Sequence, residues 1–192
     1  MSLRPVANII QYTEKHADPD KAQKIIKPLH QIKKTTKPEK TALLIKQAID
    51  EMNTNLSQDT VTEIMNSCGK DCAEYNKRTI EAALKRRRKH STLQAYLEAE
   101  EQTPQKGTRI KIDGDTIILW YTPKEFSHPM RCYCSLQRAL PLDQTTNINY
   151  CKCSEAFVHT QWERILEHPV EVEVLESAIS GSEECKFLIK PI

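Results

Sequence analysis

The residues of this chain best suited to chemistry are its seven cysteines, six of which form closely spaced pairs. The pairs are Cys68 with Cys72, Cys132 with Cys134, and Cys151 with Cys153, and the remaining thiol is Cys185. Two thiols at short spacing can direct both sulfurs at one point, and thiolates are preferred ligands of soft metal ions. The sequence therefore indicates a metal site. Neither a Gly-rich phosphate-binding loop nor a Gly-x-Ser-x-Gly motif accompanies it.

Two of the pairs have the spacing Cys-x-Cys. In an extended segment side chains alternate between two faces, so both thiols of such a pair lie on the same face. Cys132, Cys134, Cys151 and Cys153 together supply four thiolates, the number that a tetrahedral structural zinc ion requires. An iron–sulfur cluster is a second cofactor that these ligands suit. The alternative is that the thiols are buried as small apolar side chains.

Cys68 and Cys72 have a different spacing. Residues four apart share one face of a helix, although Gly69 can instead place this pair at a turn between two helices. Burial as small apolar side chains is one interpretation of the pair. A redox pair is another, because Lys70 and a nearby helix N-terminus would favour the thiolate. The two residues form a second candidate thiol site.

The composition predicts a globular protein rich in helix. The chain has only four Gly and a formal net charge of +2. No stretch approaches the roughly 20 apolar residues of a membrane span, and the first residues lack the apolar core of a signal peptide. We therefore expect a cytoplasmic protein, in which cysteines are thiols or metal ligands rather than disulfides. The basic run 85–90 suits either a nucleic-acid patch or, as the favoured interpretation, a solvated helix C-terminus.

Residues 1–103 are expected to form a helical region, because apolar residues recur there at spacings of three and four. The predicted helices cover 20–34, a segment from Pro38 to Met52, 58–67, and Asp71 to Lys89. Ser57 is the predicted N-cap of the third helix, and Gly69 follows its predicted end.

Residues 104–192 are expected to form an α+β region. Asp113-Gly114 predicts a hairpin between strands at 108–112 and 115–121. A helix is predicted at 154–167. The run VEVEVLES alternates apolar and acidic residues like a strand with one wet face, and CKFLI is its predicted antiparallel partner. The expected fold class is α+β, with a helical N-terminal half packed on an antiparallel-sheet C-terminal half with one long helix, in two regions or one integrated domain.

The C-terminal elements follow a recognisable order, which consists of a cysteine-containing segment, a helix, a Pro-Val-x-Val strand, a Gly turn and a Cys-x-Phe strand. In this chain they are Cys151 and Cys153, the Trp162 helix, Pro169 to Val174, Gly181, and Cys185 to Phe187. Residues 150–190 thereby resemble the end of the 4-vinyl reductase domain family. The helical region does not contribute to the resemblance.

The resemblance implies a small-molecule-binding, sensor-like domain with a small apolar or aromatic ligand and a cysteine-bound zinc ion. Cys151 and Cys185 match the zinc pattern of the family by position. The strand before the Gly turn offers Glu176 and then Ser177, where the family usually has a cysteine. The missing ligands would then come from Cys153 and from Cys132 or Cys134.

Three functions remain open from the sequence. The first is a cytosolic small-molecule-binding protein with a cysteine-ligated zinc site. The second is a cysteine-dependent hydrolase or a redox or iron–sulfur enzyme, and the third is a regulator or adaptor that contacts nucleic acid through the basic helical half. His159 is a candidate neighbour of the thiols, and the candidate pocket aromatics are Trp120, Tyr121, Phe126 and Trp162. The apolar helix stripes must be buried, either within the chain or in a homodimer.

Overall fold

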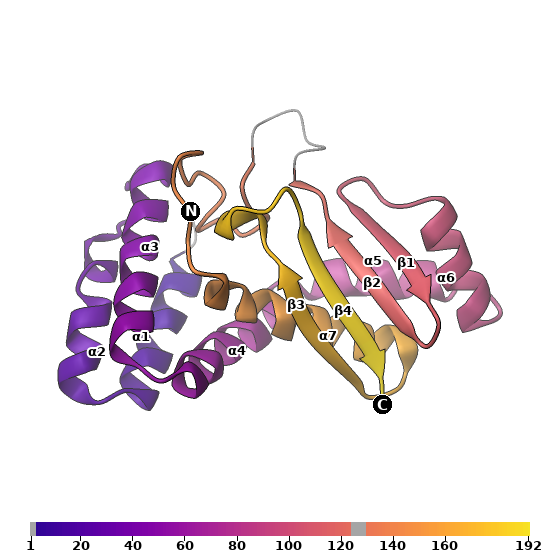
Figure 1. Cartoon of the computed structure of the whole chain (residues 1–192), viewed down its shortest axis with the longest axis horizontal. Helices are drawn as coiled ribbons and strands as arrows, with labels where there is room; N and C mark the ends of the chain where they lie inside the picture. The colour runs from indigo at the N-terminus through magenta and orange to yellow at the C-terminus, as the bar shows by residue number, and fades with distance from the viewer. Residues whose placement is uncertain (1–2, 124–129) are drawn as a thin grey trace.

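The computed structural model describes residues 3–123 and 130–192. In these ranges the chain forms seven α-helices, three short 3-10 helices and four strands, which confirms the expected α+β fold (Figure 1). The helices are α1 (Arg4–His16), α2 (Pro19–Ile26), α3 (Pro38–Asn55), α4 (Gln58–Tyr75), α5 (Lys77–Arg87), α6 (Leu93–Gln102) and α7 (Lys152–Leu166). The strands are β1 (Thr108–Asp113), β2 (Thr116–Tyr121), β3 (Val170–Glu176) and β4 (Cys185–Pro191). The 3-10 helices are η1 (Leu29–Gln31), η3 (Ile148–Cys151) and η4 (Ala178–Ser180).

Local sequence signals set most helix starts. The Oγ of Ser57 accepts a hydrogen bond from the backbone N–H of Thr60 at 3.2 Å, which confirms the predicted N-cap of α4. Pro38 stands in the first turn of α3, where its missing N–H is not needed. The predicted helix 20–34 is shorter than expected, because α2 ends at Ile26 and η1 follows. Pro28 explains the break, since it cannot donate to the helix.

The prediction that Gly69 ends a helix is wrong. Helix α4 continues through this glycine to Tyr75, and Gly69 is buried in it. The predicted helix from Asp71 to Lys89 is also wrong, because the chain breaks at Asn76 between α4 and α5. Glycine is a weak helix former, but its cost of about 1 kcal/mol is small beside the gain from close helix packing. Tertiary contacts therefore decide the length of α4.

The sheet has four strands in the order β1-β2-β4-β3, and all neighbours are antiparallel. The predicted hairpin is present, but its turn lies one residue later than Asp113-Gly114: Asp113 pairs with Thr116, and the turn residues are Gly114, with a left-handed φ of 60°, and Asp115. The run CKFLI pairs with VEVEVLE as expected, with a register shift between Val174 and Glu176. Each strand therefore presents alternate side chains to the two faces of the sheet.

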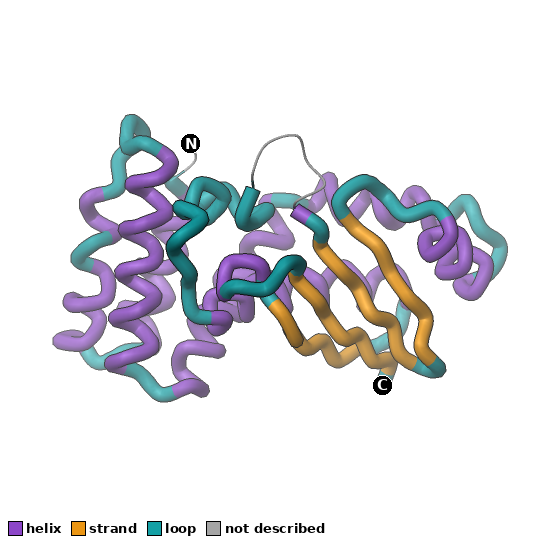
Figure 2. Tube along the Cα trace, turned by 45° about the horizontal axis from the view of Figure 1, so that its top comes forward, coloured by secondary structure: helices purple, strands orange, loops and turns teal. Residues whose placement is uncertain are grey.

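Helices cover one face of the sheet. In Figure 1, α5 and α7 lie behind the strands. Helices α1, α2 and α3 form a group at the left of the same view, and this group meets α4. Figure 2 shows the same arrangement from another angle. Helix α7 packs on β3 and β4 and also on α4, which in turn packs on α1. One cluster of buried apolar side chains includes Ile49 of α3, Val158 of α7 and Phe187 of β4. No helix of the described ranges is long and apolar enough to cross a membrane.

Candidate thiol site

The seven cysteines come from five parts of the fold, and all of them are free thiols. Cys68 and Cys72 lie on α4, and Cys132 and Cys134 lie in the segment between β2 and η3. Cys151 is the last residue of η3, Cys153 is in the first turn of α7, and Cys185 begins β4. Among the described helices, α4 and α7 pack together over the largest number of residues, so the crossing of these helices determines where the thiols meet.

Gly69 permits that close crossing. A Cβ atom at this position would lie 2.3 Å from the carbonyl oxygen of Cys153 and 2.7 Å from the Cβ of Ala156. Both distances are shorter than any van der Waals contact, so only glycine fits without a shift of one helix. The glycine thereby brings the α4 thiols at positions 68 and 72 beside the first turn of α7.

Four half-buried thiols gather at this crossing, and we call them the thiol quartet: Cys68, Cys72, Cys134 and Cys153. Every pair among the four is close enough for the charges of the two sulfurs to interact. Four thiolates match the ligand number of a tetrahedral metal ion. The quartet therefore combines the two cysteines of α4, Cys68 and Cys72, with one cysteine from each Cys-x-Cys pair, Cys134 and Cys153.

Polar partners hold two members of the quartet. The hydroxyl of Tyr150 lies 3.2 Å from the Sγ of Cys134, and the side-chain amide of Asn76 donates to the Sγ of Cys72 at 3.3 Å. The carboxylate of Asp71 is near Cys68 and is itself fixed by Asn8, which donates at 2.6 Å, and by the hydroxyl of Tyr12. Tyr150 and Asn76 thereby fix the side chains of Cys134 and Cys72, and Asp71 places a carboxylate near Cys68.

The other three cysteines are buried and adjoin the quartet, since charges on Cys132 and Cys151 also reach Cys134; we call them the thiol trio: Cys132, Cys151 and Cys185. Each pair of the trio is again within range for their charges to interact. The Sγ of Cys151 lies 2.9 Å from the Oγ of Ser177, and the backbone N–H of Ala178 points at the Sγ of Cys185 at 3.4 Å. Ser177 is completely buried. Ser177 therefore lies between Cys151 and Cys185, at the position where the resemblance to the 4-vinyl reductase domain family leads us to expect a third cysteine.

Burial raises the pKa of six of the seven thiols, and neighbouring sulfurs and carboxylates raise it further in most of them. The six are Cys68, Cys72, Cys132, Cys151, Cys153 and Cys185. Burial raises the pKa of Cys68 and of Cys151 to about 12. The neutral thiol therefore dominates at physiological pH, whereas a cysteine nucleophile works as the thiolate.

The zinc site implied by the resemblance does not fit the described residues as they stand. Cys151 and Cys185 come together, but their third neighbour is the hydroxyl of Ser177. In residues 3–123 and 130–192 no three or more His, Cys, Asp or Glu side chains are already arranged to hold a metal ion. A metal ion at the quartet would therefore need its thiols to rotate toward it.

The other candidate residues lie away from the thiols. His159 is half-exposed, its Nδ1 is 3.4 Å from the Oε2 of Glu163, and it borders a surface hollow beside β3. Trp120 lies on the sheet between Arg109 and Lys186, whereas Tyr121 and Trp162 belong to the buried side. The three described aromatic candidates thus do not line one pocket, and the fourth, Phe126, falls outside the described residues.

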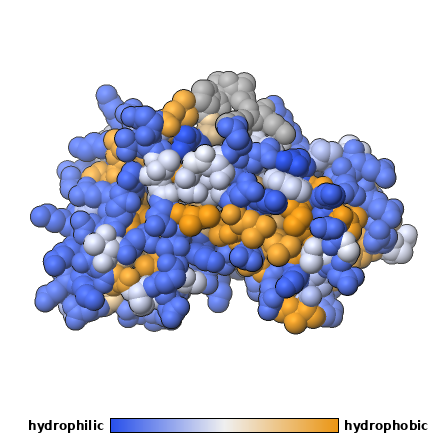
Figure 3. Space-filling view, viewed as in Figure 1, coloured by the Kyte–Doolittle hydropathy of each residue, from blue (hydrophilic) through white to orange (hydrophobic). Residues whose placement is uncertain are grey.

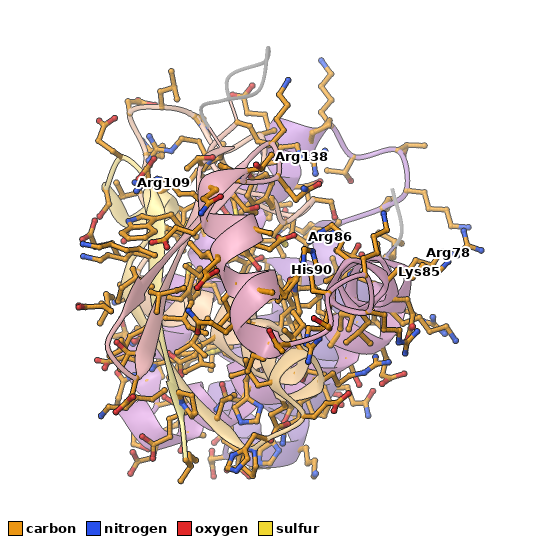
Figure 4. All side chains as sticks on the ribbon, turned by 90° about the vertical axis from the view of Figure 1, so that its right-hand side faces the viewer. Arg78, Lys85, Arg86, His90, Arg109 and Arg138 are labelled. Atoms are coloured by element: carbon orange, nitrogen blue, oxygen red, sulfur yellow. The ribbon has the colours of Figure 1, made fainter. Side chains whose placement is uncertain are left out.

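The basic run lies at the end of α5, as the favoured interpretation predicts. Arg86 forms an ion pair with Glu100 of α6 at 2.9 Å. Figure 4 shows Arg78 and Lys85 at the periphery of the molecule and Arg109 on the opposite side, beside the strands. The labelled cations of α5 and of the sheet thus belong to separate surfaces.

Sequence reasoning missed the partnership of Cys68 and Cys72 with Cys134 and Cys153. A signal was present in the glycine that follows Cys68 inside an otherwise helical pattern, because an internal glycine often marks a close approach of two helices. The identity of the approaching segment depends on tertiary structure. The sequence alone therefore could not identify α7 as the segment that approaches Gly69.

No protein-family model and no curated protein matches the chain. Among solved structures the chain is similar to an H-NOX protein from S. oneidensis in the Fe(II)NO ligation state, with 10% sequence identity and a TM-score of 0.41. The alignment covers 96% of this chain and 98% of that chain. A likeness of this size transfers neither a ligand nor a cofactor. The site is therefore interpreted from its own residues, and the resemblance to the 4-vinyl reductase domain stays a prediction.

Proposed function

We propose that the protein is a sensor-like protein that binds a small thiophilic ligand, a soft metal ion, at the thiol quartet. The observation that carries the proposal is the convergence of Cys68, Cys72, Cys134 and Cys153 from three segments at the crossing of α4 and α7. Sulfur donors favour zinc or Cu(I) over magnesium or calcium, which prefer oxygen. Zinc is the first metal to test, because four thiolates satisfy it.

The arrangement of the quartet suits binding that changes the protein. Its four cysteines are half-buried, whereas the trio is buried, so the quartet lies nearer to the surface. Cysteine side chains turn about one bond, between staggered positions, so four sulfurs can close on an ion without unfolding either helix. The ion would link α4, the segment around Cys134 and the first turn of α7. Ligand binding would thus be coupled to the packing of the helical half on the sheet half.

The two alternative functions have weaker support. A hydrolase or redox enzyme needs a reactive thiolate, and burial disfavours the thiolate at six of the seven positions. An adaptor for nucleic acid needs a continuous basic face, and the cations near Arg78 and Arg109 lie on different sides (Figure 4).

Metal titration of the 192-residue chain tests the proposal. The protein is purified under reducing conditions, stripped with a chelator, and titrated without oxygen with Zn(II) and with Cd(II), whose thiolate complexes absorb in the ultraviolet. We expect about one equivalent to bind with four thiolates, the tetrahedral number. Elemental analysis of the washed protein measures the same stoichiometry independently.

Two matched variants locate the ion. Cys134→Ser keeps an oxygen near the Tyr150 hydroxyl but removes a quartet sulfur, so we expect its affinity for Cd(II) to fall by about tenfold or more. Cys185→Ala removes a trio sulfur and should bind like the wild type. Unfolding in urea shows that both variants are folded. Stoichiometric binding that survives Cys134→Ser, or no binding by the wild type, would overturn the proposal.

A further inference from the structure

The face of the sheet opposite α7 carries an ordered pattern of charge. The strand register places two complete rows of side chains across this face. From β1 to β3 the rows are Arg109, Trp120, Lys186 and Glu176, and then Lys111, Ile118, Leu188 and Glu173. Each row thus begins with a cation on β1 and ends with a carboxylate on β3, and apolar side chains stand near the middle.

The side chains of this open face are accessible. Arg109, Lys111 and Glu173 are exposed, and Ile118 and Leu188 are half-buried. Figure 3 shows apolar side chains gathered over the middle of the sheet, between hydrophilic ones. Helix α7 packs against β3 and β4 on the other face, where Phe187 is buried. The apolar stripe of Ile118 and Leu188 is therefore available to a partner.

The two rows differ in how their charges are used. Arg109 pairs with Glu184 and stacks over Trp120, and Lys186 pairs with Glu176 at 3.6 Å. No ion pair joins Lys111 or Glu173 to another residue within the described ranges. The second row therefore presents a cation and a carboxylate at opposite edges of an apolar centre, and each is open to an outside charge.

We propose that a second copy of this chain covers the open face in a two-fold symmetric dimer. A two-fold axis parallel to the strands, in the plane of contact, stacks two such sheets face to face and places β1 of each copy over β3 of the other. Lys111 then meets Glu173 of the other copy twice, and Ile118 and Leu188 pack across the axis. The charge pattern is thereby complementary to itself, which is the property that favours a second copy over an unrelated partner.

The size of the face sets the strength of the dimer. Four strands about 4.8 Å apart and six residues at about 3.4 Å give a face of about 19 Å by about 20 Å. This flat area of about 400 Å² per copy is about half of the roughly 800 Å² that each partner contributes to a standard interface. The dimer is therefore weak, with a Kd in the micromolar range or above, and forms as the protein concentration rises.

Sedimentation of the metal-free, 192-residue chain over a range of concentrations tests the dimer. We expect the wild type to move from monomer toward dimer by about 100 µM, which is the regime of a micromolar Kd. Lys111→Glu makes both edges acidic and Glu173→Lys makes both edges basic, so each variant alone stays a monomer. Both residues are exposed, so neither change disturbs the core.

The charge reversal provides an internal control. An equal mixture of the Lys111→Glu and Glu173→Lys variants restores opposite charges at both contacts, and we expect a heterodimer. The double variant, with both changes in one chain, restores self-association. A wild type that remains monomeric at these concentrations overturns the proposal. So do single variants that dimerise like the wild type, or a mixture that stays monomeric.

Discussion

Replacing Gly69 by alanine places one methyl group in the contact between α4 and α7. The new Cβ would lie 2.3 Å from the carbonyl oxygen of Cys153, whereas ordinary contacts begin at 3.4 Å. The helices must separate by about 1 Å to accommodate it. Because a backbone oxygen and a Cβ are the closest atoms, no flexible side chain can move aside.

Two effects of opposite sign decide the stability of this variant. Overpacking a tight contact lowers the free energy of unfolding by about 1–3 kcal/mol, and a clash with backbone lies at the upper end. Alanine in place of glycine inside a helix raises it by about 1 kcal/mol. We therefore expect Gly69→Ala to lower the free energy of unfolding by about 2 kcal/mol. For a chain of this length that loss lowers Tm by about 4–8 °C.

Urea unfolding followed by circular dichroism measures the change, and Ala82→Gly is the matched control. Ala82 is exposed on α5, so its replacement by glycine reports helix propensity alone and should cost about 1 kcal/mol. Gly69→Ala should also weaken Cd(II) binding, because it moves Cys68 and Cys72 away from Cys153, whereas Ala82→Gly should not. A Gly69→Ala variant as stable as the wild type, or more stable, would refute the reasoning.

Two further predictions concern the thiols. Ser177→Cys adds a sulfur between Cys151 and Cys185 and so gives the trio a fourth thiol, the number that a zinc ion requires. Elemental analysis should find about one more zinc ion per chain than in the wild type. An unchanged metal content would contradict this prediction. In the metal-free protein at pH 7.5 the raised pKa of Cys68, about 12 against an ordinary 9.0, leaves about a thousandth of the usual thiolate. Iodoacetamide should therefore modify Cys68 slowly in the folded protein, and the rate should increase as the pH rises toward 12. In guanidinium the rate should be that of an ordinary thiol. Mass spectrometry of the peptides measures these rates. Rapid modification of the folded protein at neutral pH would count against the burial argument.

Local patterns predict much of the fold. The hairpin between β1 and β2 and the pairing of β3 with β4 follow from turn chemistry and from side-chain alternation, both of which act over a few residues. The continuation of α4 through Gly69 does not follow from a local pattern. The glycine is needed because α7, which begins at Lys152, packs closely against it. A local rule for helix ends cannot include a neighbour that is distant in sequence.

The site was predicted in its residue types but not in its grouping. Two thiols of a Cys-x-Cys pair share a face only where the backbone is extended. Cys151 ends a 3-10 helix and Cys153 starts α7, and residues two apart in a helix do not face each other. Cys151 therefore joins the buried trio while Cys153 joins the quartet. Cys132 is buried and Cys134 is half-buried, although the backbone N–H of Cys134 still points at the Sγ of Cys132 at 3.4 Å.

Because the quartet assembles at the α4–α7 crossing, its thiols are buried only after α7 has been synthesised. Its members run from residue 68 to residue 153, and a ribosome adds about 5–20 residues per second, so Cys68 emerges roughly 4–17 s before its last partner. Until α7 exists, the α4 thiols lack the neighbour that buries them and keep an ordinary pKa. Oxidants therefore reach them most easily on the nascent chain, and completion of the fold ends that exposure.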